Sequence, residues 1–578
     1  MDHHKRDFAV DYRLWRIAAI AVCIGALSTL AAYWLLGLIH FFTNLFFFQK
    51  LSFAYTSPAG NHLGLLVIVV PVIGGLIVGL MARYGSEKIR GHGIPEALEA
   101  ILFKKSKIQP KVAVLKPLSA GIAIGSGGPF GAEGPIIMTG GALGSLIAQN
   151  FHLTAGERKT LLVAGAAAGM AAVFNTPLAA LLLALELLLF EWRPRSLLPV
   201  ALACAVAGFL RPFLLDTGPL FPIQTSVTHL SSLPSCVMAG LLCGFLAAAL
   251  SSAVYKVEDI FSKTPIPWVW WPAIGGLVVG ISGYFEPRAF GVGYDVISDL
   301  LNNRIVLMSA LGLLAAKGIA WVIALGSGTS GGVLAPLLTM GAGLGVLLAP
   351  VLPGTDAQVW PLVCMAAVLA SMIGSPLTAI VFALELSHDT NAILPLLLTV
   401  TVSYGLTALI MKRSILTEKI ARRGLHVYRE YSVSPLERTH VEEVMTRTVH
   451  TIPCDSSLRT AKRIYFGSRQ AFRGYPVTTP DNRLLGILLR DDLSRFTEDD
   501  LDTTTVGELF DERPIVALPQ ETCHAIASRM ARHRLERLAV VSDMATLRLV
   551  GLVSRSDLIT PAHSIFEEEE KRERLIGL

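Results

Sequence analysis

The sequence predicts a polytopic, all-α membrane bundle made of two related halves and followed by a soluble α/β domain. Three observations lead to this fold class. Hydrophobic residues make up 52% of the 578 residues, which is too many for a soluble chain of this length. Two apolar stretches about 200 residues apart, 125–135 and 326–336, share the pattern GSG-x3-G-x3-P. The last quarter differs, because residues 425–578 hold 45 of the 93 Asp, Glu, Lys and Arg residues.

The apolar part contains several runs long enough to cross a bilayer as a helix, which takes about 20 residues. Uncharged runs lie at 17–39, 63–81, 161–185, 234–255, 357–384 and 391–411, and 305–325 holds only Lys317. The first run is far longer than the core of a signal peptide, so we expect a retained helix. Other segments are short or interrupted by Gly and Pro. Because broken helices persist in a membrane only where protein or a cavity surrounds them, we expect partly re-entrant helices.

The repeat extends beyond the glycine-rich strings. The sequence NTPL at 175–178 matches GSPL at 374–377, and a glutamate follows each proline by nine residues, Glu186 and Glu385. We expect these two glutamates to have a structural role at helix ends. Repeated apolar segments that Gly and Pro interrupt at matching positions are typical of a membrane transport site. We therefore place repeat halves at about 60–210 and 260–411 within a membrane domain of residues 1–424.

Basic residues predict the topology of the chain. Lys412, Arg413, Lys419, Arg422 and Arg423 follow the last apolar run, and Lys5, Arg6, Arg13 and Arg16 precede the first. Because basic residues favour the cytoplasmic side, both termini are expected in the cytoplasm. A charge run such as this basic collar is usually only a topological signal, so we infer no lipid site from it. Seven cysteines lie singly along the chain, so neither a disulfide framework nor a metal site is expected.

The soluble end is itself a repeat. Residues 441–493 and 506–558 each predict a short helix, a strand, a helix, two strands and a closing helix, and each ends in G-x-x-[S/L]-x-x-D. This pattern resembles the CBS-domain pair. We assign a linker to 425–440, the two CBS domains to 441–503 and 504–561, and a charged tail to 562–578.

In the CBS family the pair often binds an adenine nucleotide (ATP, ADP or AMP), and the Ser and Asp of the closing motif meet phosphate and ribose. The second repeat has both residues, Ser554 and Asp557, whereas the first keeps Asp492 but has Leu489 in place of the hydroxyl. The resemblance implies that one of two nucleotide sites is weakened or lost. No cofactor is required, and the alternative is a dimerisation and docking domain without a ligand.

Three motifs of the membrane part share one design: GHGIP at 91–95, GAEGP at 131–135 and GVLAP at 332–336. Proline starts a helix and glycine removes side-chain bulk, so backbone N–H groups are expected at positive helix ends within the bilayer. Such a place binds an anion without a fixed cation, which would hold the anion too tightly for conduction. Close helix packing would explain any one motif alone.

These motifs resemble the GSGIP, GKEGP and GxFxP signatures of the CLC family of chloride channels and proton/chloride antiporters, over about 15–424, in the prokaryotic type with a CBS pair. The resemblance implies an inner-membrane homodimer of two inverted halves per subunit. Expected partners are chloride, other small anions, protons and lipid, but not nucleic acid. It implies an anion site at His92, Gly93, Ile94, Gly134, Gly332, Val333, Leu334 and Leu416, with the amides of Val333 and Leu334 facing the central anion.

Glu133 takes the place of the family's gating glutamate. An ionisable residue at membrane depth is costly and is a functional hypothesis by default. Its carboxylate competes with chloride for the same N–H groups, and protonation removes the competition. The alternative is a structural acid paired with a buried base such as Lys116 or Lys317.

Four positions depart from the family pattern. Ala132 replaces a basic residue and Leu334 a phenylalanine. His92 and Leu416 replace a serine and a tyrosine, so two hydroxyl ligands of the anion would be missing. The His92 ring either supplies an N–H to the anion or turns away and binds a carbonyl group.

Antiporters of the family usually carry an inner glutamate at the position of Leu187. An apolar side chain cannot relay a proton, so we expect a passive, proton-gated chloride channel. The alternatives are a proton/chloride antiporter and a non-conducting receptor that senses nucleotide. An enzyme is not expected, because the sequence has no HExxH or GxSxG motif.

Overall fold

The computed structural model describes residues 12–559, except 228, 426, 428–435, 437–438, 468–471 and 498–499. It contains two compact units, one reaching Arg429 and one beginning at Glu430. Each unit has its own hydrophobic core. Most of the expected linker, the charged tail at 562–578 and the basic residues Lys5 and Arg6 lie outside the described residues.

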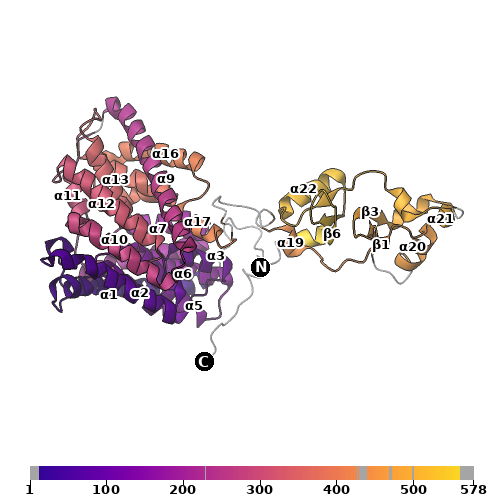
Figure 1. Ribbon diagram of the computed structural model, residues 1–578, viewed down its shortest axis with the longest axis horizontal. Coiled ribbons are helices and arrows are strands. Elements are labelled where there is room, and N and C mark those ends of the chain that lie inside the picture. The colour runs from indigo at the N-terminus through magenta and orange to yellow at the C-terminus, as the bar shows by residue number, and fades with distance from the viewer. Residues whose placement is uncertain are drawn as a thin grey trace. The chain divides into compact units, whose positions relative to one another are not determined.

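The membrane unit consists of two series of eight helices in the described part of the chain, followed by α17 (Figure 1). The first series is α1 (Arg13–Phe48), α2 (Val69–Tyr84), α3 (Ile94–Phe103), α4 (Pro110–Gly125), α5 (Glu133–Gln149), α6 (Ala155–Phe174), α7 (Pro177–Leu183) and α8 (Pro194–Leu214). The second is α9 (Leu233–Lys263), α10 (Trp271–Phe285), α11 (Tyr294–Leu301), α12 (Leu307–Gly326), α13 (Leu334–Leu348), α14 (Val359–Ile373), α15 (Pro376–Ser387) and α16 (Ile393–Ile410). The last helix, α17, spans Ile415–Ala421. The shared motifs fall at the same elements of both series, at the starts of α5 and α13 and of α7 and α15.

Helix lengths confirm the expected mixture of spanning and broken helices. Among the described residues, seven segments are long and apolar enough to cross a membrane, and they include α1, α2, α8, α9, α10, α12 and α16. Other apolar helices, such as α13, α14 and α15, are shorter. Small residues allow the short helices to approach closely: a Cβ on Gly140 of α5 would lie 2.2 Å from the carbonyl oxygen of Gly165 in α6. Such packing is typical of helices in lipid.

Glu186 and Glu385 cap helices of the opposite half. Glu186, in the π-helical turn Ala184–Leu189, accepts hydrogen bonds at Oε2 from the N–H (2.8 Å) and hydroxyl (2.6 Å) of Thr378, near the start of α15. Glu385 of α15 accepts one at Oε2 from the N–H of Ala179 (2.7 Å), near the start of α7. The first N–H groups of a helix lack helical acceptors and attract negative charge. The expected structural role of both glutamates is therefore confirmed.

The soluble unit contains two three-stranded sheets with one topology, in which a parallel pair is followed by an antiparallel pair. The first repeat is formed by α19 (Val441–Val444), β1 (Ile452–Pro453), α20 (Leu458–Tyr465), β2 (Gly474–Thr478) and β3 (Leu484–Leu489), and α21 (Asp500–Thr503) follows it. The second is formed by β4 (Val516–Ala517), α22 (Cys523–His533), β5 (Arg537–Val541) and β6 (Leu549–Ser554). Each sheet has its irregularity at the end of its middle strand, so the structure confirms a repeat.

The two repeats exchange their first segments. Val441 of α19 belongs to the core formed by α22, β5 and β6, and the Thr446 N–H donates to the carbonyl of Leu552 at 2.9 Å. Val506, which opens the second repeat, belongs to the core of the first. A third cluster, including Leu484 and Leu549, joins strands of both repeats. The two repeats therefore form one folded unit.

Candidate functional site

The starts of α3, α5 and α13 converge on one place. A Cβ on Gly134 would lie 1.9 Å from the His92 carbonyl oxygen and 3.3 Å from the Cα of Gly332. Gly131 and Gly332 form an isolated antiparallel bridge, with N–H···O distances of 2.8 and 3.2 Å. Glycine is required because a side chain would collide with the neighbouring backbone. The structure thus brings together the three motifs at 91–95, 131–135 and 332–336.

Glu133 lies at the centre of this convergence. Its side chain is fully buried, and Oε1 accepts a hydrogen bond of 3.1 Å from the N–H of Ala335. Oε2 is buried and has no hydrogen-bond partner among the described residues. Because the first N–H groups of a helix lack helical acceptors, the carboxylate occupies a place suited to an anion. The observed donor, Ala335, directly follows Leu334, the first residue of α13, and Val333 is the N-cap of this helix. Both Val333 and Leu334 are buried.

Two buried lysines hold backbone turns and do not bind Glu133. Lys116 Nζ donates to the carbonyl of Gly91 at 2.7 Å, in the turn before α3. Lys317 Nζ donates to the carbonyl of Val292 at 3.2 Å, in the turn before α11. Neither lysine is a hydrogen-bond partner of Glu133 in the part of the chain that the structure describes. The geometry therefore gives no support to a structural ion pair.

His92, Gly93 and Ile94 form the start of α3. Gly93 is the N-cap with φ of 87°, a conformation that residues with a Cβ rarely adopt. Ile94 is the first helical residue and is buried. The His92 side chain is also buried, and its Nδ1 has no hydrogen-bond partner among the described residues. The ring lines the pocket described next.

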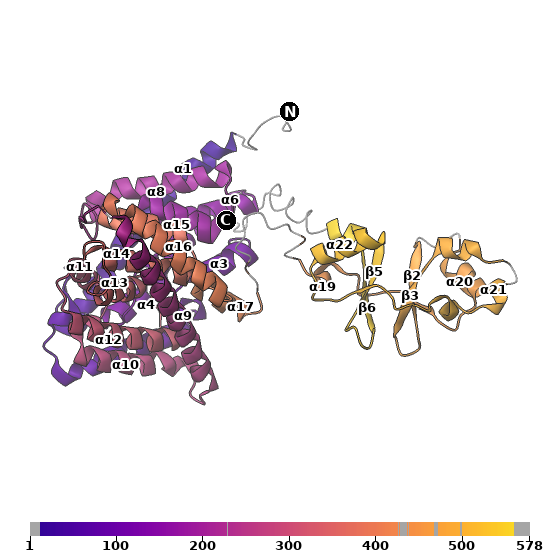
Figure 2. The same cartoon turned by 90° about the horizontal axis from the view of Figure 1, so that it is seen from above.

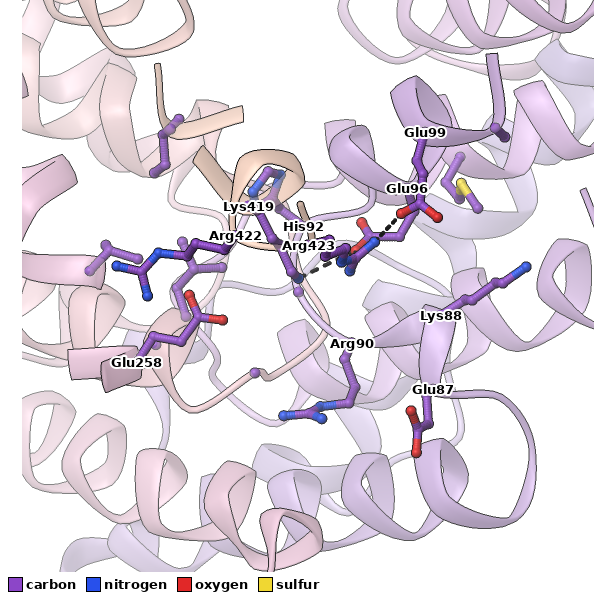
Figure 3. A pocket seen from close by; sticks show the side chains of 18 of the residues that line it. Glu87, Lys88, Arg90, His92, Glu96, Glu99, Glu258, Lys419, Arg422 and Arg423 are labelled. Carbon is purple, nitrogen blue, oxygen red and sulfur yellow. Dashed lines mark hydrogen bonds and ion pairs between the residues drawn. The ribbon is translucent and has the colours of Figure 1, made fainter. Parts of the chain in front are cut away.

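A pocket of about 490 Å³ lies beside α3, the end of α9 and α17 (Figure 3). Its charged lining residues are Lys88, Arg90, Lys104, Lys107, Lys419, Arg422, Arg423, Glu87, Glu96, Glu99 and Glu258. Seven of these are basic and four are acidic, so the pocket has an excess of positive charge. Such a concave surface raises the local concentration of anions.

The basic collar is attached to α3 through acids that line the pocket. Arg423 Nη2 donates to Glu96 at 2.9 Å, and its Nη1 donates to Glu99. Lys419 Nζ lies 3.3 Å from Glu96. Figure 3 shows Arg423 and Lys419 turned toward the acids of α3. The collar therefore also has a structural role, because buried acids need such partners, and these bases line the pocket as well.

Leu416 and Leu187 lie in apolar surroundings. Leu416 is fully buried in α17, and the hydroxyl of Tyr255 in α9 donates to the carbonyl of the preceding residue, Ile415. Leu187 is fully buried in the π-helical turn that carries Glu186. Neither position offers a hydroxyl or an ionisable group.

The candidate nucleotide residues of the soluble unit already pair with one another. Asp557 Oδ2 accepts hydrogen bonds of 2.8 Å from both the N–H and the hydroxyl of Ser554. Asp492 accepts one of 3.0 Å from the N–H of Leu489. Each aspartate thus closes the turn after its last strand, and only the second repeat adds a hydroxyl.

Comparison with known proteins identifies the family. The profile described as the voltage gated chloride channel matches residues 74–408, and the CBS domain profile matches 441–499 and 506–562. The chain belongs to the voltage-gated chloride channel family. It is an integral, multi-pass member of this CLC family and carries two CBS domains.

Two curated relatives differ in the transport that their names describe. The chain is 28% identical to the voltage-gated ClC-type chloride channel ClcB of Escherichia coli, over 71% of this chain and 100% of ClcB. It is 27% identical to the H(+)/Cl(-) exchange transporter ClcA of Klebsiella pneumoniae, over 58% of this chain and 74% of ClcA. A crystal structure of a eukaryotic CLC transporter matches the fold with a TM-score of 0.62 and 19% identity, covering 94% of this chain and 98% of that one.

Sequence reasoning missed three features of this CLC protein. It did not find Ala335 as the donor to Glu133, the attachment of the collar to α3, or the function of the buried lysines. A signal for the lysines was present, because Lys116 and Lys317 each precede a GSG string by nine residues. They belong to the repeat, which favours a shared structural role over a single ion pair with Glu133.

Proposed function

We propose that this CLC protein is a passive, proton-gated chloride channel in which Glu133 is the gate. One observation carries the proposal: the Glu133 carboxylate binds the N–H of Ala335 at the start of a helix. Chloride and a carboxylate compete for such a donor. While Glu133 is ionised it occupies the place of the anion, and the path is closed.

Protonation removes the charge that holds Glu133 against the positive helix end. The side chain is then free to leave, and chloride takes its place. The basic pocket lined by Arg90, Lys419 and Arg422 concentrates chloride next to His92. Flux should therefore rise on acidification. Bromide, nitrate and fluoride are further candidate anions.

A proton/chloride antiporter is the second candidate, and the name of the relative ClcA favours it. An antiporter must carry protons to Glu133 from both sides of the membrane. Leu187 offers no ionisable group for the inner part of that route. This position is our reason for preferring the channel.

The assembly proposed for the protein is a homodimer with one pore per subunit and two inverted halves in each, in the inner membrane with both termini in the cytoplasm. The basic collar after α16 supports the cytoplasmic position of the C-terminus. For the soluble unit we propose an adenine nucleotide as the ligand of Ser554 and Asp557. A bound nucleotide can regulate flux only through a difference in affinity between two states of the protein.

The reversal potential of the reconstituted protein under combined chloride and pH gradients tests the function. A passive channel has a reversal potential set by chloride alone, whereas coupled exchange shifts it with the pH gradient at a fixed ratio. Such a shift would replace the channel by the antiporter. Absence of any anion flux, in wild type and in Glu133→Ala alike, would favour the non-conducting receptor.

A further inference from the structure

The second half of the repeat contains a counterpart of the helix start that carries His92. The turn Gly291–Gly293 precedes α11 as Gly91–Gly93 precedes α3, and Gly293 caps α11 with φ of 77°. Lys317 holds the carbonyls of this turn as Lys116 holds those of the first. The start of α11 is therefore built in the same way as a helix start that lies at the anion site.

Tyr294 is the first residue of α11 and takes the place that Ile94 has in α3. Its ring packs edge-on against Phe174 and Phe221, with centroid distances of 5.9 and 6.2 Å. The hydroxyl is buried and has no hydrogen-bond partner among the described residues. Burying a hydroxyl group without a hydrogen-bond partner costs free energy. A bound ligand at this hydroxyl would remove that cost.

Tyr294 is the first residue of α11, which packs against α13, the helix whose start binds Glu133. Tyr294 is close enough to Glu133 to interact with its charge, but no hydrogen bond joins the two side chains, and Glu133 Oε2 is also without a partner. Each group is therefore free to bind a third. A hydroxyl donor beside a competing carboxylate is the arrangement that an anion site needs.

The helix that begins at Tyr294, α11, lies away from the helices α3 and α17 that line the basic pocket. Both ribbon views place α11 at one end of the membrane unit and α3 and α17 at the opposite end (Figures 1 and 2). Tyr294, Phe174 and Phe221 are not among the residues that line the pocket. An anion that leaves Glu133 on this side would meet the Tyr294 hydroxyl.

We propose that the Tyr294 hydroxyl binds the permeating chloride ion on the side of Glu133 away from the basic pocket. The proposal rests on the proposed function and adds a ligand to it. The phenol supplies a hydroxyl donor that His92 and Leu416 do not, and its ring has little conformational freedom to lose. The buried ammonium group of Lys317 donates to the carbonyl of Val292 in the same turn, and its positive charge favours an anion there. The neighbouring Asp295 accepts a hydrogen bond from Ser57 at 2.8 Å.

Tyr294→Phe tests the proposal, because it removes the hydroxyl and keeps the ring. Chloride flux into proteoliposomes is measured against the chloride concentration on the side of the membrane opposite the basic pocket. We expect the half-saturating concentration to rise about tenfold, the usual effect of losing one hydrogen bond to a charged group. Tyr284→Phe, which alters an exposed tyrosine, is the matched control and should match wild type.

The same substitution in a Glu133→Gln background separates a direct ligand from an effect on the gate. A direct ligand raises the half-saturating concentration by the same factor with or without the carboxylate. An unchanged chloride dependence in Tyr294→Phe, or an effect that vanishes with Glu133→Gln, would overturn the proposal. Absence of chloride flux in the wild type would instead overturn the proposed function, so the two failures are distinguishable.

Discussion

The Glu133 carboxylate and the Ala335 N–H are 202 residues apart in the chain and form a hydrogen bond of 3.1 Å. The acid belongs to the first half of the repeat and the donor to the second. The candidate gate is therefore formed between the halves, and it depends on the ionisation of one side chain.

Neutralising Glu133 should remove the pH dependence of chloride flux. We expect wild-type flux to rise on acidification and Glu133→Gln and Glu133→Ala to conduct at all pH values, because neither variant carries a charge that competes with chloride. Flux into proteoliposomes between pH 4.5 and 7.5 is the measurement. Glu157→Gln is the control, since Glu157 is an acid of the same domain that pairs with Arg13. A Glu133→Ala protein that keeps the wild-type pH dependence would contradict the gate.

A carboxylate at position 187 should allow proton movement. In the wild type a chloride gradient should drive no protons uphill, because Leu187 cannot relay them. We expect Leu187→Glu to show proton uptake driven by chloride, measured with a pH-sensitive dye inside the vesicles. Leu187→Gln has a similar size and polarity but no titratable group, so it should behave as the wild type. Uphill proton movement in the wild type would contradict the prediction.

Glu186 and Glu385 form crosswise caps, since each caps a helix of the opposite half, and removing either cap should destabilise the membrane unit. Glu186→Ala leaves the N–H and hydroxyl of Thr378 without their acceptor, at a cost of about 2 kcal/mol. Glu385→Ala should cost less, because its bonds go only to backbone N–H groups. Thermal unfolding in detergent measures both. Thr378→Val is the control for the hydroxyl and should account for part of the Glu186 effect. Equal midpoints for all variants would show that the caps contribute nothing.

The soluble unit should bind one adenine nucleotide. We expect calorimetry on the 425–578 fragment with ATP, ADP or AMP to give a stoichiometry nearer one than two, because only the second repeat pairs a hydroxyl with its aspartate. Asp557→Ala should weaken binding more than Asp492→Ala, which serves as the matched control. No heat and no thermal shift with any of the three nucleotides would leave the unit a structural domain.

The ionised carboxylate of Glu521 should stabilise the soluble unit at pH values above its pKa. Burial raises the pKa of Glu521, but hydrogen bonds from Arg529 and from the Leu518 N–H outweigh burial and hold this pKa below its usual range. A lowered pKa stabilises the fold above the unfolded pKa of about 4.3, and this stability is lost as the pH falls through the folded pKa. Urea unfolding should therefore show Glu521→Gln less stable than the wild type at pH 7 and similar to it near pH 3. A constant difference at both pH values would contradict this account.

The sequence predicted the parts of the fold that repeat. Broken helices follow from Gly and Pro in apolar runs, and the matched positions of Glu186 and Glu385 were enough to predict a structural role. The partners were not predictable, because a hydrogen bond such as Glu133 to Ala335 depends on how the two halves pack. The phenol of Tyr294 was missed for the same reason: its motif resembles GHGIP only in the turn that precedes the helix. The ion pairs between the collar and α3 were not predicted, because basic residues beside a membrane have a sufficient topological explanation.

The crosswise caps also set the order in which the chain can complete its fold. During synthesis the start of α7 enters the membrane first, yet its acceptor at Glu385 is made 206 residues after Ala179. The first half must therefore wait, with the start of α7 uncapped, until almost all of the second half has been inserted. Glu186, by contrast, is synthesised before α15, the helix that it caps. Each half thus needs a glutamate of the other half to cap one of its helices. The membrane domain can complete these hydrogen bonds only after nearly all of it has been synthesised.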